Sequence, residues 1–571
     1  MASKHWKQLI AEKRERQAAT IPKEWILTNL PPKEALNVID FPEKSGLLTD
    51  KELEITSAHV EVLLEKISTG IWSSVEVTTA FSKRAIIAHQ LVNCLTEIFI
   101  ERALEKAAKL DEYLKSTGKV VGPLHGLPIS LKDQVSIKGI ESTLGYVSWI
   151  NHYAEKNSVL ADILEACGAV LYVKTNIPQT LMWPETFNYV FGRTLNPFNR
   201  SLTSGGSSGG EGALIALKGS PLGKFCDISL ISIRIPSAFN GLYGLRPSYA
   251  RVPYAGCVNS MEGQDSVPSV LGPMSTSLEG VKSFMKAVVG QTPWLKDPLA
   301  VRKPWSEEEY QLSDHGGDKK ALVFAILWHD ELVLPHPPVT RALEHTKTAL
   351  IDAGHKVLDW KPLKHSDIYR TIGGIWSSGA AEDYRVATQP TGEPVVASMK
   401  PGVEDPDHTD PEIPPFRPLA DGISAFQLWQ IQKERRDLRQ EYMDHWNATV
   451  RSTGSGRPID AIISPCAAYA APPHGMNKSA NYTMVWNALD YTALVIPTGL
   501  SVDPVLDAKK PPHEFFGDLD KANYEFYDPA TFKDAPLCIQ VVGRTLEEEG
   551  VIAMGEVVDA ALKVKFMNSK L

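Results

Sequence analysis

The sequence predicts an α/β protein, with a β-sheet and helices packed against it. Two observations support this fold class. Up to about residue 118, apolar residues recur three and four positions apart, which is typical of amphipathic helices. After Gly118, short apolar runs alternate with helical stretches, as strands and helices do in α/β proteins. No change in composition divides the chain, so we expect one large domain with a helical segment at its N-terminus.

The elements follow from the spacing of apolar residues along the chain. Three segments have helical spacing before Gly118: HVEVLLEKI (59–67), VTTAFSKRAIIAHQLV (77–92) and RALEKAAKLDEYL (102–114). The strand-like runs are LHGLPISL (124–131), AVLYVKT (169–175), DAIISP (460–465), ALVIPTGLS (493–501) and APLCIQVVGR (535–544). Helical patterns recur in SVLADILEAC (158–167) and GVIAMGEVVDAALKVKF (550–566).

Two long stretches interrupt this pattern. Residues 388–421 are rich in proline and acidic side chains, and a second irregular stretch covers 503–534. Strand-like runs resume after each stretch, so we expect both to be surface excursions from the same domain.

Composition and charge narrow the class of function. The chain has 571 residues, of which 43% are hydrophobic and 22% charged, and its net charge is −9. It contains no long run of Lys or Arg, so we expect no nucleic-acid partner and no anionic membrane surface, and small neutral substrates fit better. The six cysteines include no CxxC pair, which predicts neither a metal site nor a disulfide framework and favours a reducing compartment.

The ends of the chain carry information about location. The N-terminus is charged throughout and lacks the apolar core of a signal peptide, and no run of about 18 apolar residues occurs. The last three residues, Ser569, Lys570 and Leu571, match the peroxisomal address that an import receptor binds. We therefore expect a peroxisomal protein, with a cytoplasmic location and a chance tail as the alternative.

The stretch SGGSSGG, from Ser204 to Gly210, is either a flexible linker or a rigid loop. It is followed by the helix-like pattern EGALIAL, which favours a loop that leads into a helix N-terminus. The loop lacks the GK[ST] of a phosphate-binding loop and the GxSxG of a nucleophile elbow. A serine nucleophile needs a base, and Lys132 in the apolar run GLPISLKDQV is a candidate, because burial would favour its neutral amine. The alternative is a strand-end lysine that reaches solvent.

Four motifs occur in order: GPLHGLPISLKDQ, KTNIPQT, GGSSGGEGAL and SIRIPSAFNGLYGLRPS. Together with EKRERQAATIPKEW near the start and LCIQVVGR near the end, they resemble the amidase signature family, and fungal acetamidases within it. The resemblance implies a twisted mixed β-sheet flanked by helices, with an N-terminal helical segment (1–75) and an amidase signature domain (76–571). It also implies hydrolysis of small linear carboxamides without a metal or organic cofactor. A homodimer is compatible with it.

The resemblance assigns roles to particular residues. Lys132 matches the base, Ser207 the serine that follows a cis peptide bond and relays the proton, and Ser232 the nucleophile. Leu181 and Met182 align with residues that line the acyl channel, with ordinary core packing as the alternative, and Gly205 and Gly206 are placed beside the substrate. His125 and Asp133 are expected to be structural, and Asp227 and Arg234 to pair and hold the nucleophile loop.

The segment before Ser232 departs from the family pattern. Members carry a sequence close to GTDIGGSIR, whereas this chain has FCDISLISIR, with one more residue and no glycine. The oxyanion hole is therefore assigned to the backbone of Ile228, Ser229, Leu230 and Ile231, where bulky side chains replace glycine. Three functions remain open at this point: an active amidase, an impaired relative or mispredicted gene product, and a Ser–Lys esterase.

Overall fold

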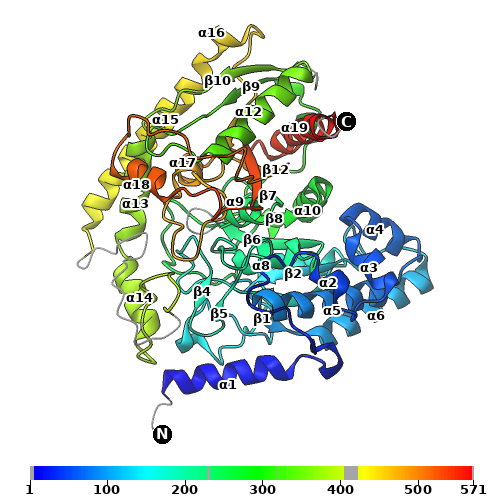
Figure 1. The fold of residues 1–571 in the computed structure, drawn as a ribbon. Helices are drawn as coiled ribbons and strands as arrows, with labels where there is room; N and C mark the ends of the chain where they lie inside the picture. The colour runs from blue at the N-terminus through cyan, green and yellow to red at the C-terminus, as the bar shows by residue number, and fades with distance from the viewer. Residues whose placement is uncertain (1–4, 228–231, 318, 320, 404–421, 569–571) are drawn as a thin grey trace.

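The computed structural model describes residues 5–227, 232–317, 319, 321–403 and 422–568, with backbone only at 224–227 and 566–568. The predicted α/β class is confirmed: in the described residues one 11-stranded mixed sheet runs through the molecule and helices pack around it (Figure 1). Its strands, in spatial order, are β1 (Leu95–Ile98), β3 (Val170–Thr175), β2 (Pro128–Lys132), β6 (Leu222–Asp227), β8 (Val270–Ser275), β7 (Tyr243–Arg246), β12 (Ala493–Ser501), β13 (Pro536–Val542), β11 (Ala461–Pro465), β9 (Val323–Ile326) and β10 (Lys356–Asp359).

Parallel and antiparallel pairs alternate in blocks across this sheet. β3, β2 and β6 are parallel neighbours, as are β11, β9 and β10, and the strands between them pair antiparallel. A separate ribbon joins β4 (Phe187–Asn188) to β5 (Gly192–Arg193). Because β2 and β6 run in the same direction, their carboxyl ends lie at the same edge of the sheet. Lys132 ends β2, and the chain reaches Ser232 five residues after β6, so the topology brings both residues to this edge.

Helices cover the sheet along its whole width. The first half of the chain contributes α1 (Trp6–Ala19), α2 (Phe41–Lys44), α3 (Asp50–Ser57), α4 (Val60–Ser68), α5 (Ser74–Val92), α6 (Ile100–Thr117), α7 (Val159–Ala166), α8 (Gly209–Ala216), α9 (Arg234–Phe239) and α10 (Leu278–Gly290). The second half contributes α11 (Glu307–Tyr310), α12 (Pro337–Asp352), α13 (His365–Ser377), α14 (Ala380–Thr388), α15 (Ala425–Ala448), α16 (Val450–Thr453), α17 (Asn481–Leu489), α18 (Asp518–Phe526) and α19 (Glu548–Asn568). α12 packs on α19 near the C-terminus, while α13 packs on α15 (Figure 1).

Two regions differ from the sequence-based prediction. The first 118 residues were predicted to be helical, but Leu95–Ile98 form β1, which pairs antiparallel with β3 at the sheet edge. Four residues between two long helices are too few to interrupt the helical spacing on either side, so the strand leaves no separate pattern. The excursion 503–534 is also more ordered than predicted, because it contains α18 and buries Tyr527 and Phe532.

Part of the other excursion lies outside the described residues, as does the C-terminal tripeptide. Within 388–421, the described part from 389 to 403 contains no helix or strand.

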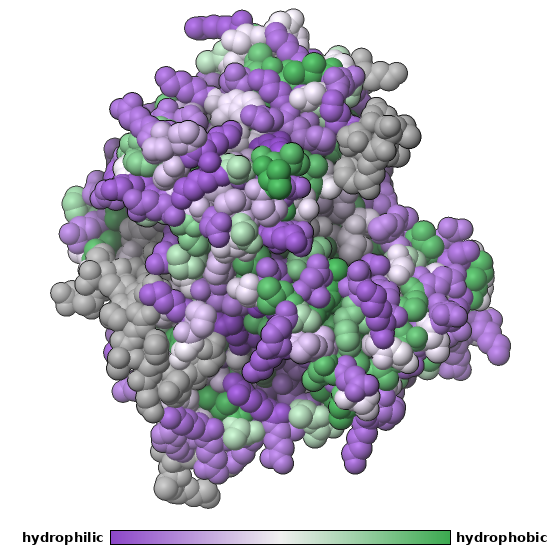
Figure 2. Space-filling model, in the orientation of Figure 1, coloured by the Kyte–Doolittle hydropathy of each residue, from purple (hydrophilic) through white to green (hydrophobic). Residues whose placement is uncertain are grey.

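On the face drawn in Figure 2, hydrophilic side chains cover most of the surface and apolar residues form small groups. Among the described helices, none combines the length and hydropathy that a membrane-spanning segment requires.

Candidate active site

The serine-rich stretch is a buried, rigid loop that leads into α8. Ser204 to Gly210 are all buried, and the peptide bond between Gly206 and Ser207 is cis. A Cβ atom on Gly206 would lie 2.6 Å from both N and O of Glu185 and 2.7 Å from O of Trp183. Only glycine therefore lets the loop lie this close to the backbone of 183–185. The linker alternative is excluded by this packing.

Lys132, Ser207 and Ser232 meet at the sheet edge that the topology defines. Lys132 Nζ lies 2.7 Å from Ser207 Oγ and 2.7 Å from Ser232 Oγ, and the two hydroxyl oxygens are 2.7 Å apart. All three side chains are fully buried. The lysine thus lies inside the protein and does not reach solvent, contrary to the alternative left open by its sequence. The arrangement places an amine in direct contact with two hydroxyl groups, as a proton relay requires.

Ser208 is a further hydroxyl at this site that the sequence analysis did not single out. Its Oγ lies 2.7 Å from Ser232 Oγ, and it comes from the residue directly after Ser207. The second serine of the SerSer pair was the available signal. Because Ser208 Oγ contacts Ser232 Oγ directly, it is placed to orient the nucleophile.

Glu211, in the first turn of α8, is a buried carboxyl group beside this site. Thr175 Oγ1 donates to its Oε2 at 2.5 Å, and Ser130 Oγ donates to its Oε1. Burial raises the pKa of Glu211 to about 8, while hydrogen bonds from Ser130 and Thr175 and the charge of Lys132 oppose the rise. Glu211 therefore ties the serine loop to β2 and β3, the strands on which Lys132 and Thr175 pair. The acidic residue in GGSSGGEGAL was the only sequence signal.

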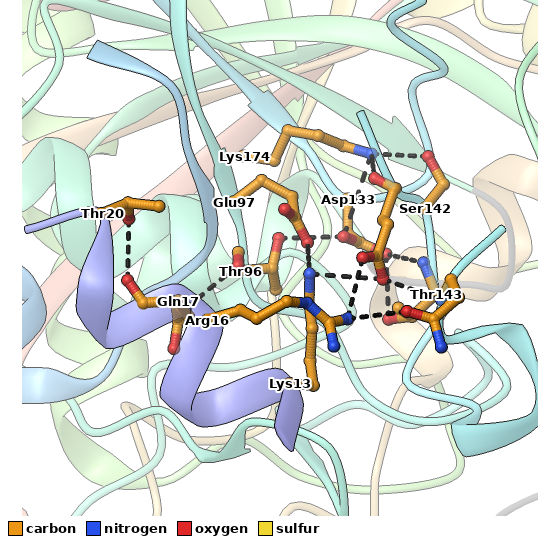
Figure 3. A network of polar contacts seen from close by, with 12 residues as sticks. Lys13, Arg16, Gln17, Thr20, Thr96, Glu97, Asp133, Ser142, Thr143 and Lys174 are labelled. Atoms are coloured by element: carbon orange, nitrogen blue, oxygen red, sulfur yellow. Dashed lines mark hydrogen bonds and ion pairs between the residues drawn. The ribbon is translucent and has the colours of Figure 1, made fainter. Parts of the chain in front are cut away.

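Asp133, next to Lys132, is held by backbone and side-chain donors. Thr96 Oγ1 donates to Oδ1 at 2.9 Å, and the backbone N–H groups of Thr143 and Leu144 donate to Oδ2 at 2.9 and 3.0 Å. These bonds fit the structural role expected for Asp133. Figure 3 shows it within a wider polar network that reaches α1, and Lys174 Nζ lies 3.9 Å from its Oδ1.

The network in Figure 3 joins the N-terminal helix to the sheet. Lys13 Nζ of α1 lies 2.5 Å from Glu97 Oε1 and 3.3 Å from Glu141 Oε2. Burial raises the pKa of Glu97 to about 7, and the charge of Lys13 opposes this shift. Lys174 donates to the backbone carbonyl of Glu141 at 2.7 Å, and burial lowers the pKa of its amine. The segment after Lys132 is thus fixed from both α1 and β3.

The other sequence-based assignments are spread around this centre. Gly205 and Gly206 directly precede Ser207. Leu181 and Met182 are buried and lead into 183–185, the segment that packs against Gly206. They therefore belong to the wall beside the serine loop, and their contact with an acyl group stays a prediction.

His125 and Arg234 are both held by neighbouring groups. His125 Nδ1 accepts the backbone N–H of Val121 at 3.0 Å, which fits a structural role. Arg234, two residues after Ser232, donates to Asn487 Oδ1. The side chain of Asp227, the predicted partner of Arg234, lies outside the described atoms.

The predicted oxyanion hole, Ile228 to Ile231, also lies outside the described residues. In the part of the chain that is described, no group of three or more His, Cys, Asp or Glu side chains is arranged to hold a metal ion. The described side chains that meet at this site are the amine of Lys132 and the hydroxyls of Ser207, Ser208 and Ser232.

A model of the amidase family matches residues 76–552. The chain belongs to this family and is an amide-hydrolysing enzyme. An acetamidase from Emericella nidulans is 42% identical over 557 residues, covering 98% of this chain and 98% of the relative. An acetamidase from Aspergillus oryzae is 41% identical over 562 residues, covering 98% and 100%. Among solved structures, a fatty acid amide hydrolase has a TM-score of 0.87 at 33% identity, covering 98% of this chain and 96% of that one. The resemblance inferred from the motifs is thus confirmed.

Proposed function

We propose that the protein hydrolyses small linear carboxamides, such as acetamide, to a carboxylate and ammonia through an acyl-enzyme on Ser232. The observation that carries this proposal is the triangle of 2.7 Å contacts among Lys132 Nζ, Ser207 Oγ and Ser232 Oγ. That two relatives are acetamidases supports the choice of a small amide. Neither comparison favours an impaired relative or a Ser–Lys esterase.

The first half of the reaction forms the acyl-enzyme. Neutral Lys132 accepts the proton of Ser207 Oγ, which accepts the proton of Ser232 Oγ, and Ser232 Oγ bonds to the amide carbon. The carbonyl oxygen becomes an oxyanion, which we assign to the backbone N–H groups of 228–231. When the C–N bond breaks, the proton returns from Lys132 through Ser207 to the nitrogen, and ammonia leaves.

The second half repeats these transfers with water. Water attacks the acyl carbon of Ser232 and gives its proton to Ser207, while protonated Lys132 is regenerated. The bond from the acyl carbon to Ser232 Oγ then breaks, the serine regains its proton, and the carboxylic acid is released as its carboxylate. Burial of the three side chains keeps bulk water from competing for these protons.

Ammonia release from purified protein tests this proposal. We expect turnover of acetamide, with propionamide and benzamide showing which acyl size is preferred, and loss of turnover in Ser232→Ala. Ethyl acetate is offered as a second substrate to separate the amidase from the esterase alternative. Hydrolysis of ethyl acetate without hydrolysis of acetamide would indicate an esterase, because the amidase proposal requires the amide to be hydrolysed.

A second version of the chain tests the impaired alternative. In it, Ser229, Leu230 and Ile231 are replaced by two glycines, which restores the family pattern and removes the additional residue. Ammonia release only from this version would support an impaired enzyme and overturn the proposal for the chain as it stands. Equal rates would show that the altered loop forms a working oxyanion hole.

A further inference from the structure

The carboxyl group of Glu211 lies where the three chain segments that carry the proposed relay come together. Glu211 is fully buried in the first turn of α8, four residues after Ser207. α8 packs on β2, β3 and β6, of which β2 ends at Lys132 and β6 leads to Ser232. The steps of the reaction given above do not involve Glu211. A group at this junction can nevertheless set the geometry of all three segments at once.

Three neighbouring strands surround this carboxyl group. Thr175 Oγ1 of β3 donates to Oε2 at 2.5 Å, and Ser130 Oγ of β2 donates to Oε1. On β6, a Cβ atom at Gly223 would collide with Oε1, so only glycine leaves room for the carboxyl group there. Ser130 is paired with Gly223 and Thr175 with Lys132 across the sheet. The carboxyl group is therefore held against the part of the sheet that carries the base.

These contacts connect Glu211 with both ends of the first proton transfer. Ser130 and Lys132 are two residues apart on β2, so their side chains leave the same face of the sheet. Thr175 lies directly beside Lys132 on β3. On the other side, the start of α8 joins Glu211 to Ser207. Glu211 thus links the strand that carries the amine with the loop that carries the hydroxyl group, and these two groups lie 2.7 Å apart.

The charge of Glu211 matters to the base beside it. Burial raises the pKa of Glu211 to about 8, and its two hydrogen bonds and the charge of Lys132 oppose the rise, so the carboxyl group is uncharged at neutral pH. The other titratable groups that interact with it are Tyr172 of β3 and Cys94, which precedes β1, and burial raises the pKa of both, so they are neutral as well. A hydroxyl group donates and accepts, so the same two partners can hold a protonated carboxyl group. An uncharged neighbour does not favour the protonated form of Lys132, and the relay requires the neutral amine.

We propose that Glu211 is a positioning residue for the base: as a neutral carboxyl group it holds Lys132 against Ser207 through Ser130 and Thr175, without drawing a proton onto the amine. The proposal rests on the amide hydrolysis proposed above, because it concerns the same base. Glu211 acts through other residues and takes no step in the reaction itself.

Steady-state ammonia release from acetamide by two variants tests this role. Glu211→Ala removes the bonds to Ser130 and Thr175, and should lower kcat about tenfold to a hundredfold with little change in KM, because the amine is misplaced relative to Ser207. Glu211→Gln keeps an uncharged group that donates and accepts, and should restore kcat to within about threefold of the parent.

A matched control separates positioning from a general loss of stability. Asp460 is another buried carboxyl group, which accepts the backbone N–H of Val323 at 2.7 Å in the other half of the sheet. Asp460→Ala should lower the melting temperature, as Glu211→Ala does, but should leave kcat unchanged. Melting temperatures also establish that each variant is folded under the conditions of the assay.

Labelling by a fluorophosphonate gives a second readout, which does not depend on the amide. Ser232 Oγ bonds to phosphorus, fluoride leaves, and the hydroxyl proton passes to Lys132 through Ser207. The rate constant of labelling, followed by mass spectrometry, should fall in Glu211→Ala by the same factor as kcat and recover in Glu211→Gln. As the pH is lowered, labelling of the parent and of Glu211→Gln should decline with the same midpoint, because the carboxyl group is already neutral there.

The outcomes distinguish this role from the proposed function. Labelling of the parent without release of ammonia would count against the amide substrate alone, and the labelling rates of the variants would still decide the role of Glu211. Three results would overturn that role: Glu211→Ala as fast as the parent, equal losses in Glu211→Ala and Glu211→Gln, or a midpoint in Glu211→Gln about one pH unit or more below that of the parent. The last result would show that Glu211 is negatively charged in the parent, because loss of a negative neighbour lowers the pKa of an amine.

Discussion

Replacing Ser207 with alanine removes the hydroxyl group that contacts both Lys132 and Ser232. Its oxygen lies 2.7 Å from each partner atom, so both proton transfers of the relay pass through it. Positioned acid–base groups contribute roughly 10²- to 10⁴-fold to rate, and we expect Ser207→Ala to lower kcat for acetamide by a factor in this range. Lys132 Nζ stays 2.7 Å from Ser232 Oγ, so some direct transfer is retained.

Ser208→Ala is the matched control, because it removes a neighbouring hydroxyl 2.7 Å from the same nucleophile. Loss of one neutral hydrogen bond changes a rate by roughly 2- to 10-fold, so this variant should lose much less activity. The assay is steady-state ammonia release, with kcat and KM determined separately. Ser207→Ala within tenfold of the parent, or Ser208→Ala as damaging as Ser207→Ala, would refute the assignment of the relay.

Three other changes test the surroundings of the site and the address of the protein. Gly206→Ala places a Cβ 2.6 Å from the backbone of Glu185, so it should lower amidase activity and should lower the free energy of unfolding by about 1–3 kcal/mol. Gly290→Ala is the control, because nothing lies within 4 Å of a Cβ at that position. Equal melting temperatures of the two variants would contradict the packing argument. Burial raises the pKa of Glu211 to about 8, so the folded protein keeps a proton on this carboxyl that the unfolded chain releases above about pH 4.5. The free energy of unfolding therefore falls as the pH rises from about 4.5 to about 8. Denaturant unfolding of Glu211→Gln should therefore show a smaller loss of stability between about pH 5 and about pH 9 than the parent shows, and an equal loss would argue against a buried proton. A fluorescent reporter ahead of the C-terminal Ser569-Lys570-Leu571 should collect in peroxisomes and become cytosolic when the tripeptide is deleted, and a diffuse signal with the intact tail would contradict this proposed location.

Much of the fold could be predicted from the sequence, because its strands and helices carry clear apolar periodicity. The runs 124–131, 169–175 and 535–544 became β2, β3 and β13, and 77–92 lies within α5. β1 was missed because its four residues depend on pairing with β3, a tertiary contact that leaves no local pattern. α18 was missed because its segment is rich in proline and polar residues on both sides.

The site was predicted only in part, for a similar reason. Lys132, Ser207 and Ser232 lie in motifs that can be recognised along the chain, and the structure brings them together. Glu211 and Ser208 acquire their positions from the way α8 packs on β2 and β3, which no spacing in the sequence reveals.

Rapid acid quenching followed by peptide mass spectrometry tests directly whether Ser232 carries the acyl group. Protein mixed with excess acetamide is quenched during turnover, digested and compared with the same sample of Ser232→Ala. We expect one acetyl group on the peptide that contains Ser232, and none in Ser232→Ala or Lys132→Ala. An acetyl group on a different residue, or undiminished ammonia release by Ser232→Ala, would contradict the account.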